Sequence, residues 1–454
     1  MVRILKALCL LALFAALNLK PVVARADWPV EVFAAVSADP LIADINGDGK
    51  NEVVIATLAT KQDEARIYVF NDTGKSLPGW PKSIFDDNSN SMVNNEGPAV
   101  ADFNGDGKQE LCFASGWQGP GKVHLLDYKG DYLPGWPVTM PEKAVPCMAS
   151  VIADVNGDGK QEIIVATTNP DKLYVYGFDG LVISGWPREI FGRCAGVAVG
   201  DVNEDGKNEM IAWTASRRLY GWQADGSSLW PVKIFQEESI ESCAVADVNN
   251  DGSRQIVAGT NKGRIYIWDA QTLWPLAGWE KPRELGEGNI KVSLADIDND
   301  KKLEIVANLI KRKGGSYAGN GAIHIIKSDG STLPGWPQEL TSSWIDRSIV
   351  LVDTDGDNKL ELMGNSRDGK LHLWRYSGEY VEGYPRVLFG NRNLIAGPVI
   401  GDISGDGFMD AIVTYYNAYN KAFLVKFTGA CEPKALVWPK AMYNNQNNMF
   451  VTNR

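Results

Sequence analysis

Residues 43–56 read ADINGDGKNEVVIA, an acidic loop that runs directly into an apolar segment. Asp44, Asn46 and Asp48 stand at alternate positions, and Glu52 follows four residues after Asp48. Carboxylates packed this closely repel one another unless a positive charge lies among them. The loop therefore indicates a bound cation.

Calcium suits such a loop, because it takes six to eight oxygen ligands and accepts them from alternate positions of a short loop. With Asp44 as position 1, Asn46 and Asp48 are positions 3 and 5, the backbone carbonyl of Lys50 is position 7 and Glu52 is position 9. Glycine at position 6 permits a sharp turn. Unlike the helix-flanked EF-hand, this loop lies between PLIADI and EVVIA, which read as strands. A single copy could equally be a solvated acidic turn.

The loop recurs eight times, at separations of 58, 52, 47, 46, 49, 57 and 49 residues, which excludes coincidence. In chain order, and with position 7 contributing its backbone carbonyl, the candidate ligands are Asp44, Asn46, Asp48, Lys50 and Glu52 in loop 1; Asp102, Asn104, Asp106, Lys108 and Glu110 in loop 2; Asp154, Asn156, Asp158, Lys160 and Glu162 in loop 3; Asp201, Asn203, Asp205, Lys207 and Glu209 in loop 4; Asp247, Asn249, Asp251 and Ser253 in loop 5; Asp296, Asp298, Asp300, Lys302 and Glu304 in loop 6; Asp353, Asp355, Asp357, Lys359 and Glu361 in loop 7; and Asp402, Ser404, Asp406, Phe408 and Asp410 in loop 8. We expect up to eight Ca²⁺ ions, with loop 5 the weakest site because Gln255 replaces its last acid.

The residues between the loops repeat as well, which indicates an array of similar sheets. An apolar segment follows each loop, then a segment ending in a glycine turn, then Trp-Pro or a close variant; the first unit reads EVVIA, ARIYVFNDTG and KSLPGWPKSIF. Each unit predicts four short antiparallel strands, with the acidic loop between the first and second. Four-stranded sheets around an axis form a β-propeller. We therefore predict an all-β propeller of eight blades, with seven as the alternative.

These loops and their spacing resemble the FG-GAP/VCBS repeats of integrin α-chain-like propellers, which occur in many secreted bacterial proteins. The resemblance covers essentially the whole chain after the leader, and it implies calcium in the loops and a role in adhesion or glycan binding. Integrin propellers have seven blades, whereas this chain has eight loops. An eight-bladed calcium propeller is also similar to bacterial rhamnogalacturonan lyases. Because a propeller hosts many functions, the resemblance does not name a ligand.

The first 26 residues have the pattern of a signal peptide. Arg3 and Lys6 precede an apolar core over residues 7–17, and the segment ends in the cleavage pattern ARA before Asp27. We expect a secreted, periplasmic or cell-surface protein, with residues 27–454 as one propeller domain. The alternative, an uncleaved anchor, is disfavoured because the apolar core is too short to span a bilayer. No later segment predicts a membrane span.

The acidic net charge of −11 has its origin in the loops, which hold 25 of the 56 acidic residues. Eight divalent ions would offset this charge, so the acidity indicates a demand for metal. A basic stripe with interleaved aromatic residues is absent, so nucleic acid is not an expected partner. The sequence does not define an oligomeric state.

Cysteine and histidine indicate neither zinc nor catalysis. Cys147 and Cys194 hold equivalent positions in neighbouring repeats. A disulfide between them is conceivable, but small buried side chains are the favoured interpretation. His124, His324 and His372 share one repeat position with tyrosines and a phenylalanine of other units, so we expect them to pack rather than to react. Lys, Arg or Tyr could still serve a lyase.

Candidate ligand-binding residues come from the strand order. The acidic loops and glycine turns share one end of every sheet, and the other connections share the opposite end. Irregular insertions fall at that opposite end, at residues 86–96, 115–121 and 311–321. Trp117, Tyr317 and Trp344 lie in such segments, where aromatic side chains on a rigid scaffold suit a sugar. The alternative is that these are ordinary variable loops.

We therefore predict a calcium-stabilised extracellular propeller that binds a glycan or a protein and has no catalytic residues. The alternative function is a polysaccharide-degrading enzyme resembling rhamnogalacturonan lyase.

The two chain ends predict how the ring closes. Nine segments begin with Trp-Pro or a variant, from Trp28 to Trp438, although there are eight loops. Either DWPVEVF (27–33) or LVWPKAMY (436–443) should form the outer strand of a blade whose other strands come from the opposite end of the chain. The remaining copy should pack outside that strand or lie as a covering tail.

Overall fold

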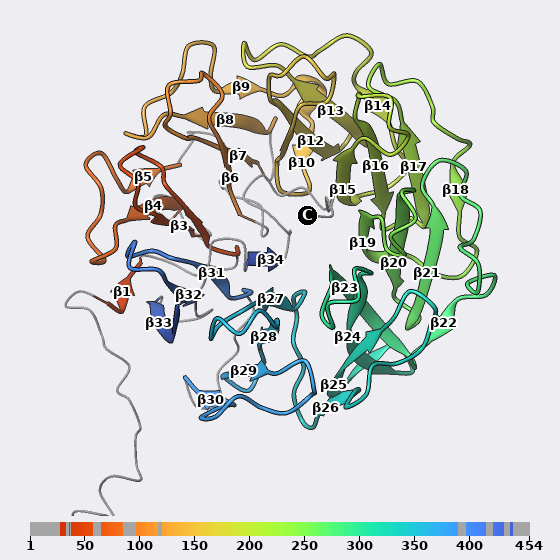
Figure 1. Cartoon of the computed structure of the whole chain (residues 1–454). Coiled ribbons are helices and arrows are strands. Elements are labelled where there is room, and N and C mark those ends of the chain that lie inside the picture. Colours follow the sequence, from red (N-terminus) through yellow and green to blue (C-terminus); the bar gives the residue numbers. More distant parts are fainter. Residues whose placement is uncertain are drawn as a thin grey trace, which may run out of the picture.

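The chain folds into a ring of antiparallel sheets around a central axis (Figure 1). The computed structural model describes residues 28–32, 36, 38–57, 65–84, 97–116, 120–388, 396–414, 421–430 and 436–438. Within these residues the only helix is a single 3₁₀ turn, η1 (Pro141–Lys143). The predicted all-β propeller is confirmed.

The described strands group into eight sheets, which we number in chain order. Sheets 1–4, each given from its inner to its outer strand, are β2 (Leu41–Ala43), β3 (Glu52–Ala56), β4 (Arg66–Phe70) and β5 (Lys82–Ser83); β6 (Ala99–Ala101), β7 (Glu110–Ser115), β8 (Lys122–Leu126) and β9 (Val138–Thr139); β10 (Val145–Pro146) with β11 (Val151–Ala153), β12 (Glu162–Thr168), β13 (Lys172–Tyr176) and β14 (Arg188–Glu189); and β15 (Cys194–Gly200), β16 (Glu209–Thr214), β17 (Arg218–Trp222) and β18 (Lys233–Ile234).

Sheets 5–8 follow the same order with two additions from the chain ends. They are β19 (Ile240–Ala246), β20 (Gln255–Thr260), β21 (Arg264–Asp269) and β22 (Arg283–Glu284); β23 (Gly288–Ala295), β24 (Glu304–Lys313), β25 (Ser316–Ile326) and β26 (Gln338–Leu340); β34 (Leu436–Trp438), β27 (Val350–Val352), β28 (Glu361–Asn365), β29 (Lys370–Trp374) and β30 (Arg386–Val387); and β31 (Val399–Gly401), β32 (Phe408–Thr414), β33 (Lys421–Ala430) and β1 (Val30–Glu31).

Each acidic loop joins the first strand of its sheet to the second, as predicted. The strand after the loop is buried on both faces; EVVIA in β3, for example, is buried at all five residues. The reason is that each sheet packs between two neighbours. One continuous core combines Val151 and Ile164 of sheet 3 with Val197 and Met210 of sheet 4. This explains why these strands are apolar throughout instead of alternating.

In most sheets a tryptophan precedes the outer strand and links that sheet to the next one around the ring. In seven sheets its indole N–H donates to the second backbone carbonyl of the glycine turn, or of its equivalent, in the following sheet. The seven bonds measure 2.7–3.3 Å and join Trp28 to Asp72, Trp80 to Tyr128, Trp136 to Phe178, Trp186 to Ala224, Trp230 to Ala270, Trp279 to Ser328 and Trp336 to Tyr376. The tryptophans are thus inter-sheet links as well as core residues.

The N-terminal segment closes the ring. β1 pairs with β33, with Val30 opposite Ala422, so the first residues supply the outer strand of the last sheet. Trp28 then bonds to Asp72 in sheet 1, and Asn51 in loop 1 donates to the Asp402 carbonyl in loop 8 at 2.7 Å. The predicted exchange of a strand between the chain ends is confirmed.

The second Trp-Pro segment is placed differently from the prediction. β34 pairs with the innermost strand of sheet 7, where Leu351 faces Trp438, and it lies near the centre of the ring in Figure 1. The expectation that this copy packs outside the closing strand or covers it as a tail is therefore wrong. The inner edge of β27 offers unpaired backbone groups, and β34 pairs with them.

No helix in the part of the chain that the structure describes has the length and apolar character needed to cross a membrane. The expected signal peptide at residues 1–26 lies outside the described residues.

Removing residues 27–35 should loosen sheet 8, although the other strands of that sheet come from the opposite end of the chain. We expect amide hydrogen exchange at residues 421–430 to accelerate by about tenfold or more, the factor that corresponds to ~1.4 kcal/mol of local opening free energy. Mass-spectrometric exchange measures this, with sheet 4 as the internal control. Unchanged protection at 421–430 would show that β1 does not hold the ring closed.

Candidate functional site

The last acidic position of every loop has a structural duty. In all eight loops the side chain at position 9 is buried, with 0–3 % of its surface exposed. Its oxygen accepts the backbone N–H of position 2 at 2.7–3.2 Å, from Ile45 to Glu52, Phe103 to Glu110, Val155 to Glu162, Val202 to Glu209, Val248 to Gln255, Ile297 to Glu304, Thr354 to Glu361 and Ile403 to Asp410. The spacing in the sequence did not reveal this second role.

Backbone N–H groups hold the other acidic side chains in place. In loop 1, Asp44 accepts from Gly47 and Gly49 at 2.8 Å, and Asp48 accepts from Lys50 at 2.9 Å. These bonds require a left-handed backbone at positions 4 and 6, where φ is +75° at Gly47 and +83° at Gly49. Lys301 and Asn358, which replace the position-6 glycine in loops 6 and 7, keep the same conformation, with φ of +70° and +62°.

Burial beside two other acids makes the position-9 glutamates weak acids. Burial is the main cause that raises the pKa of Glu52 to about 7, and the charges of Asp48 and Asp44 raise it further. The pKa of Glu110 and of Glu162 rises to about 7 for the same reasons. A positive charge inside the loop would reverse this effect.

Loops 1–4 fit a hard cation. Their side chains offer carboxylate and amide oxygens around one small interior, which is the donor set that calcium takes. In loop 1 the Asn46 amide nitrogen lies 3.2 Å from Asp48 and 3.3 Å from Glu52, so positions 3, 5 and 9 converge on each other. These residues would hold the ion, which would supply the missing positive charge.

Loops 5–7 depart from this arrangement. The Gln255 amide in loop 5 donates to the Ser253 carbonyl at 3.0 Å, which uses the backbone oxygen expected to bind metal. In loop 6 the ammonium of Lys327 is hydrogen-bonded to Asp298. In loop 7, Arg375 lies 3.4 Å from Asp355.

A cluster of aromatic rings and arginines lies at the opposite end of sheets 6 and 7, and we call it the Tyr317–Trp344 cluster. The two rings stack with centroids 5.5 Å apart and planes 5° from parallel. Arg312 lies 4.8 Å from the Tyr317 ring, and Arg367 lies 4.9 Å from the Trp344 ring. Two of the three predicted ligand-binding residues are therefore brought together, whereas Trp117 lies outside the described residues.

The cluster is rigidly supported. Arg367 pairs with both carboxylate oxygens of Asp346, at 2.5 and 3.2 Å, and the Trp344 indole donates to the same carboxylate at 3.0 Å. Tyr317 is on the long β24–β25 hairpin, opposite Arg312 in the strand register. The segment 311–321, expected to be an irregular insertion, is thus mostly paired strand. Its alternation of Lys, Arg and Gly concealed this in the sequence.

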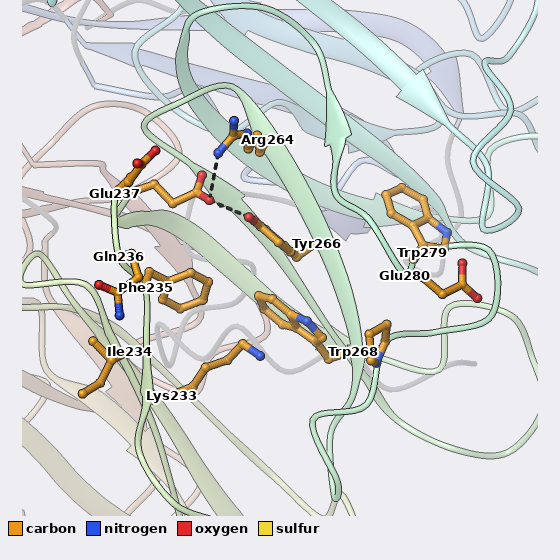
Figure 2. A pocket seen from close by; sticks show the side chains of 12 residues that line it. Lys233, Ile234, Phe235, Gln236, Glu237, Arg264, Tyr266, Trp268, Trp279 and Glu280 are labelled. Atoms are coloured by element: carbon orange, nitrogen blue, oxygen red, sulfur yellow. Dashed lines mark hydrogen bonds and ion pairs between the residues drawn. The ribbon is translucent and has the colours of Figure 1, made fainter.

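A pocket of about 450 Å³ lies at the outer edge between sheets 4 and 5 (Figure 2). Phe235, Tyr266 and Trp268 form aromatic walls, and Glu238 is 5 % exposed. One oxygen of Glu238 accepts from the Tyr266 hydroxyl at 2.5 Å and from Arg264 at 3.5 Å, while the other has no partner among the described residues. The sequence did not predict this pocket, because its residues come from the crossover between two repeats.

Lys233 lines the same pocket, with its ammonium 4.8 Å from the Trp268 ring. Burial lowers the pKa of Lys233, and burial together with the bond to Glu238 raises the pKa of Tyr266.

The histidines pack as expected. His124 contacts Ser115 at 2.7 Å and Tyr132 at 2.8 Å, and His372 makes the equivalent contacts with Ser366 and Tyr380 at 2.9 Å. Burial lowers the pKa of His324 and of His372 to about 4.

The cysteines agree with the structural interpretation. Cys112, Cys147, Cys194 and Cys243 are buried and form no disulfide, and the sulfur of Cys147 lies 3.9 Å from the backbone oxygen of Cys194. The conceivable disulfide between Cys147 and Cys194 is therefore not formed.

The repeats match a known family model. The FG-GAP-like repeat matches residues 44–113, 102–165, 154–212 and 353–413, which together are just over half of the chain. The chain therefore belongs to the FG-GAP-like repeat family, as its loops suggested. No curated protein matches the sequence.

Solved structures share the fold at low identity. The exotype rhamnogalacturonan lyase YesX is 17 % identical with a TM-score of 0.60, over 93 % of this chain and 78 % of that one. The Bacillus licheniformis rhamnogalacturonan lyase PL11 is 15 % identical with a TM-score of 0.60, over 94 % and 80 %. Sqt1 of Saccharomyces cerevisiae is 11 % identical with a TM-score of 0.58, over 88 % and 98 %. At these identities the likeness shows the propeller fold alone.

Calcium should stabilise the protein more at pH 7.5 than at pH 5. Because the folded-state pKa of the loop glutamates is raised from 4.5 to about 7, the metal-free fold is favoured below pH 4.5 and loses stability as the pH rises through 7. Calcium offsets that loss, by about 2.7 kcal/mol for each site at a free concentration one hundred times its Kd. The measurement is the difference in Tm between calcium and excess chelator at each pH.

The matched control is Glu52→Gln, which copies the amide of loop 5 and keeps an acceptor for the Ile45 N–H. This variant should reduce the Tm difference between calcium and chelator at pH 7.5, and it should leave that difference nearly unchanged at pH 5. An identical Tm in calcium and in chelator at both pH values would contradict the assignment of these loops to metal.

Proposed function

We propose that this protein is an extracellular, calcium-stabilised binding module that takes an acidic glycan at the Tyr317–Trp344 cluster. Calcium in loops 1–4 stiffens one end of the sheets, and the cluster presents a ligand surface at the other end. The leader pattern at residues 1–26 supports an extracytoplasmic location.

The observation that carries this proposal is an exposed aromatic stack flanked by arginines. Tyr317 is 54 % exposed while it stacks on Trp344, so part of the ring remains open to a ligand. The apolar face or edge of a sugar ring packs on such side chains. Arginine adds planar donors for carboxylate or hydroxyl oxygens.

The charge around the stack favours an acidic ligand. Asp346 neutralises Arg367, whereas Arg312 has no carboxylate partner among the described residues; its guanidinium lies over the Tyr317 ring and donates to the Gly315 carbonyl at 3.4 Å. Lys313 beside it is exposed. A glycan carboxylate would pair with the positive charges of Arg312 and Lys313.

Tyr317→Ala should weaken binding to an acidic polysaccharide by about tenfold, since aromatic contacts of this kind contribute ~1 kcal/mol or more. Affinity electrophoresis in gels that contain polygalacturonate measures the effect. The matched control is Trp274→Ala, which removes a tryptophan that is 75 % exposed, the highest value among the described tryptophans, from the opposite end of sheet 5. Equal retardation of wild type and Tyr317→Ala would overturn the proposal, and retention of a protein partner but of no glycan would redirect it to a protein ligand.

The pocket of Figure 2 supports a second candidate function, degradation of an acidic polysaccharide by β-elimination. A lysine whose pKa is lowered by burial is a better base than an ordinary lysine. Lys233 would remove the proton next to the sugar carboxylate, a C=C bond would form as the glycosidic C–O bond breaks, and water would protonate the departing oxygen. Arg264, which already pairs with Glu238 and Glu284, would lie beside that carboxylate. The buried Glu238 would position Tyr266 and Arg264 beside the sugar through its hydrogen bonds to both.

Incubation with polygalacturonate or rhamnogalacturonan should then produce the ultraviolet absorbance of unsaturated sugars. Lys233→Met should abolish this signal, with a loss of at least about a hundredfold expected for a general base. Lys262→Met, an exposed-turn control in the same sheet, should keep it. A wild-type protein that binds these polymers without any product would exclude the enzyme and leave the binding module.

A further inference from the structure

One position in the repeats changes its charge together with the acidic loop that it faces. The first residue of the turn between the third and fourth strands is uncharged or acidic in the first five repeats and cationic in the sixth and seventh. In chain order these residues are Asn71, Asp127, Gly177, Gln223, Asp269, Lys327 and Arg375. Loop position 3 is Asn in the first five repeats and Asp in the sixth and seventh. A cation in the turn therefore accompanies an extra acid in the loop.

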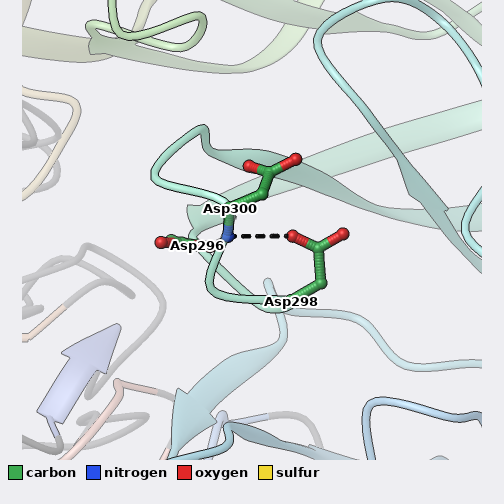
Figure 3. Close-up of side chains that lie close together, drawn as sticks. All are labelled: Asp296, Asp298 and Asp300. Atoms are coloured by element: carbon green, nitrogen blue, oxygen red, sulfur yellow. Dashed lines mark hydrogen bonds between the residues drawn. The ribbon is translucent and has the colours of Figure 1, made fainter.

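The structure brings the cationic turn residue into contact with the additional acid at loop position 3. In loop 6 the Lys327 ammonium is hydrogen-bonded to Asp298 and lies 3.4 Å from Asp300. Figure 3 shows Asp296, Asp298 and Asp300 around one tight turn, and one carboxylate oxygen of each lies within 4.8 Å of the others. Lys327 therefore reaches the group of oxygens that a metal ion would need.

Loop 5 also contains an internal hydrogen-bond donor, but this donor is an uncharged amide. Gln255 accepts the Val248 N–H at 2.7 Å as the glutamates do, and its amide nitrogen donates to the Ser253 carbonyl. The position-9 charge is absent, and the position-7 carbonyl already has a donor.

We infer that Lys327 is the permanent counter-cation of loop 6, and that loops 5 and 6 hold their shape without metal whereas loops 1–4 take calcium. This inference rests on the proposed calcium binding of loops 1–4. A tethered ammonium is present at any calcium concentration, whereas a bound ion leaves when its concentration falls below its Kd.

The consequence concerns the binding cluster. Sheet 6 carries loop 6 at one end and the β24–β25 hairpin, with Tyr317, at the other. A sheet that does not depend on metal keeps this hairpin in place when calcium is scarce. Ligand binding at Tyr317 should therefore respond to chelation much less than the stability of sheets 1–4 does.

Hydrogen exchange of the wild-type protein with calcium and with chelator tests the inference directly. Calcium should increase protection at residues 44–52, 102–110, 154–162 and 201–209, and it should leave 247–255 and 296–304 unchanged. Calcium-dependent protection at 296–304 in the wild type would overturn the inference while leaving the proposed calcium binding intact. If calcium protected none of the loops from exchange, both the inference and the proposed calcium binding of loops 1–4 would be wrong.

The variant Lys327→Gln tests whether the Lys327 ammonium prevents calcium from binding in loop 6. It should bind one more calcium per chain than the wild type, counted by equilibrium dialysis, and protection at 296–304 should become calcium-dependent. Lys281→Gln, which changes an exposed lysine outside the acidic loops, is the matched control and should bind the wild-type number. If Lys327→Gln does not fold, Lys327→Gln with Asp298→Asn reproduces the Gln223–Asn203 pair of loop 4 and should gain the same ion. An unchanged count in the variant that folds would overturn the inference.

Discussion

The hydrogen bond from a tryptophan indole to a carbonyl of the next sheet is the interaction on which the ring depends. A propeller sheet has little contact with any sheet but its two neighbours, so its orientation is set by what crosses each junction. Seven tryptophans make this bond at equivalent positions, from Trp80 in sheet 1 to Trp28 at the end of sheet 8. Each buries a large ring and satisfies its only donor in one contact, which fixes both the depth and the angle of packing.

The acidic loops act on the same junctions from the inside of each sheet. The buried position-9 side chain holds the loop closed through the position-2 N–H, so a residue that looks like a metal ligand is also a backbone anchor. Gln255 keeps the anchor and loses the charge, which separates the two roles within one molecule. The proposed calcium loops and the loops with an internal donor can therefore coexist in one ring.

Much of this fold follows from the sequence because its signals are repeated. Eight acidic loops at a period near fifty residues predict eight similar sheets, and nine Trp-Pro segments predict a strand shared between the chain ends. What the sequence did not predict depends on contacts between segments that lie far apart in the chain. β34 pairs with the inner edge of β27. The Tyr266 hydroxyl donates to Glu238 across the connection between two repeats. Lys327 is hydrogen-bonded to Asp298, which lies 29 residues earlier in the chain. No periodic pattern within one unit reports such contacts, although the paired change of charge at Lys327 was visible in an alignment of the repeats.

The most direct test of the central link is the hydrogen-exchange rate of the tryptophan indole N–H groups, measured by NMR on protein with ¹⁵N-labelled tryptophan. Trp274, which is 75 % exposed, provides the unprotected reference within the same molecule. The Trp28 signal, assigned by its loss in Trp28→Phe, should exchange far more slowly than the Trp274 signal and at a rate similar to Trp80 and Trp136. A Trp28 indole that exchanges as fast as Trp274 while the others stay protected would contradict closure of the ring by this bond.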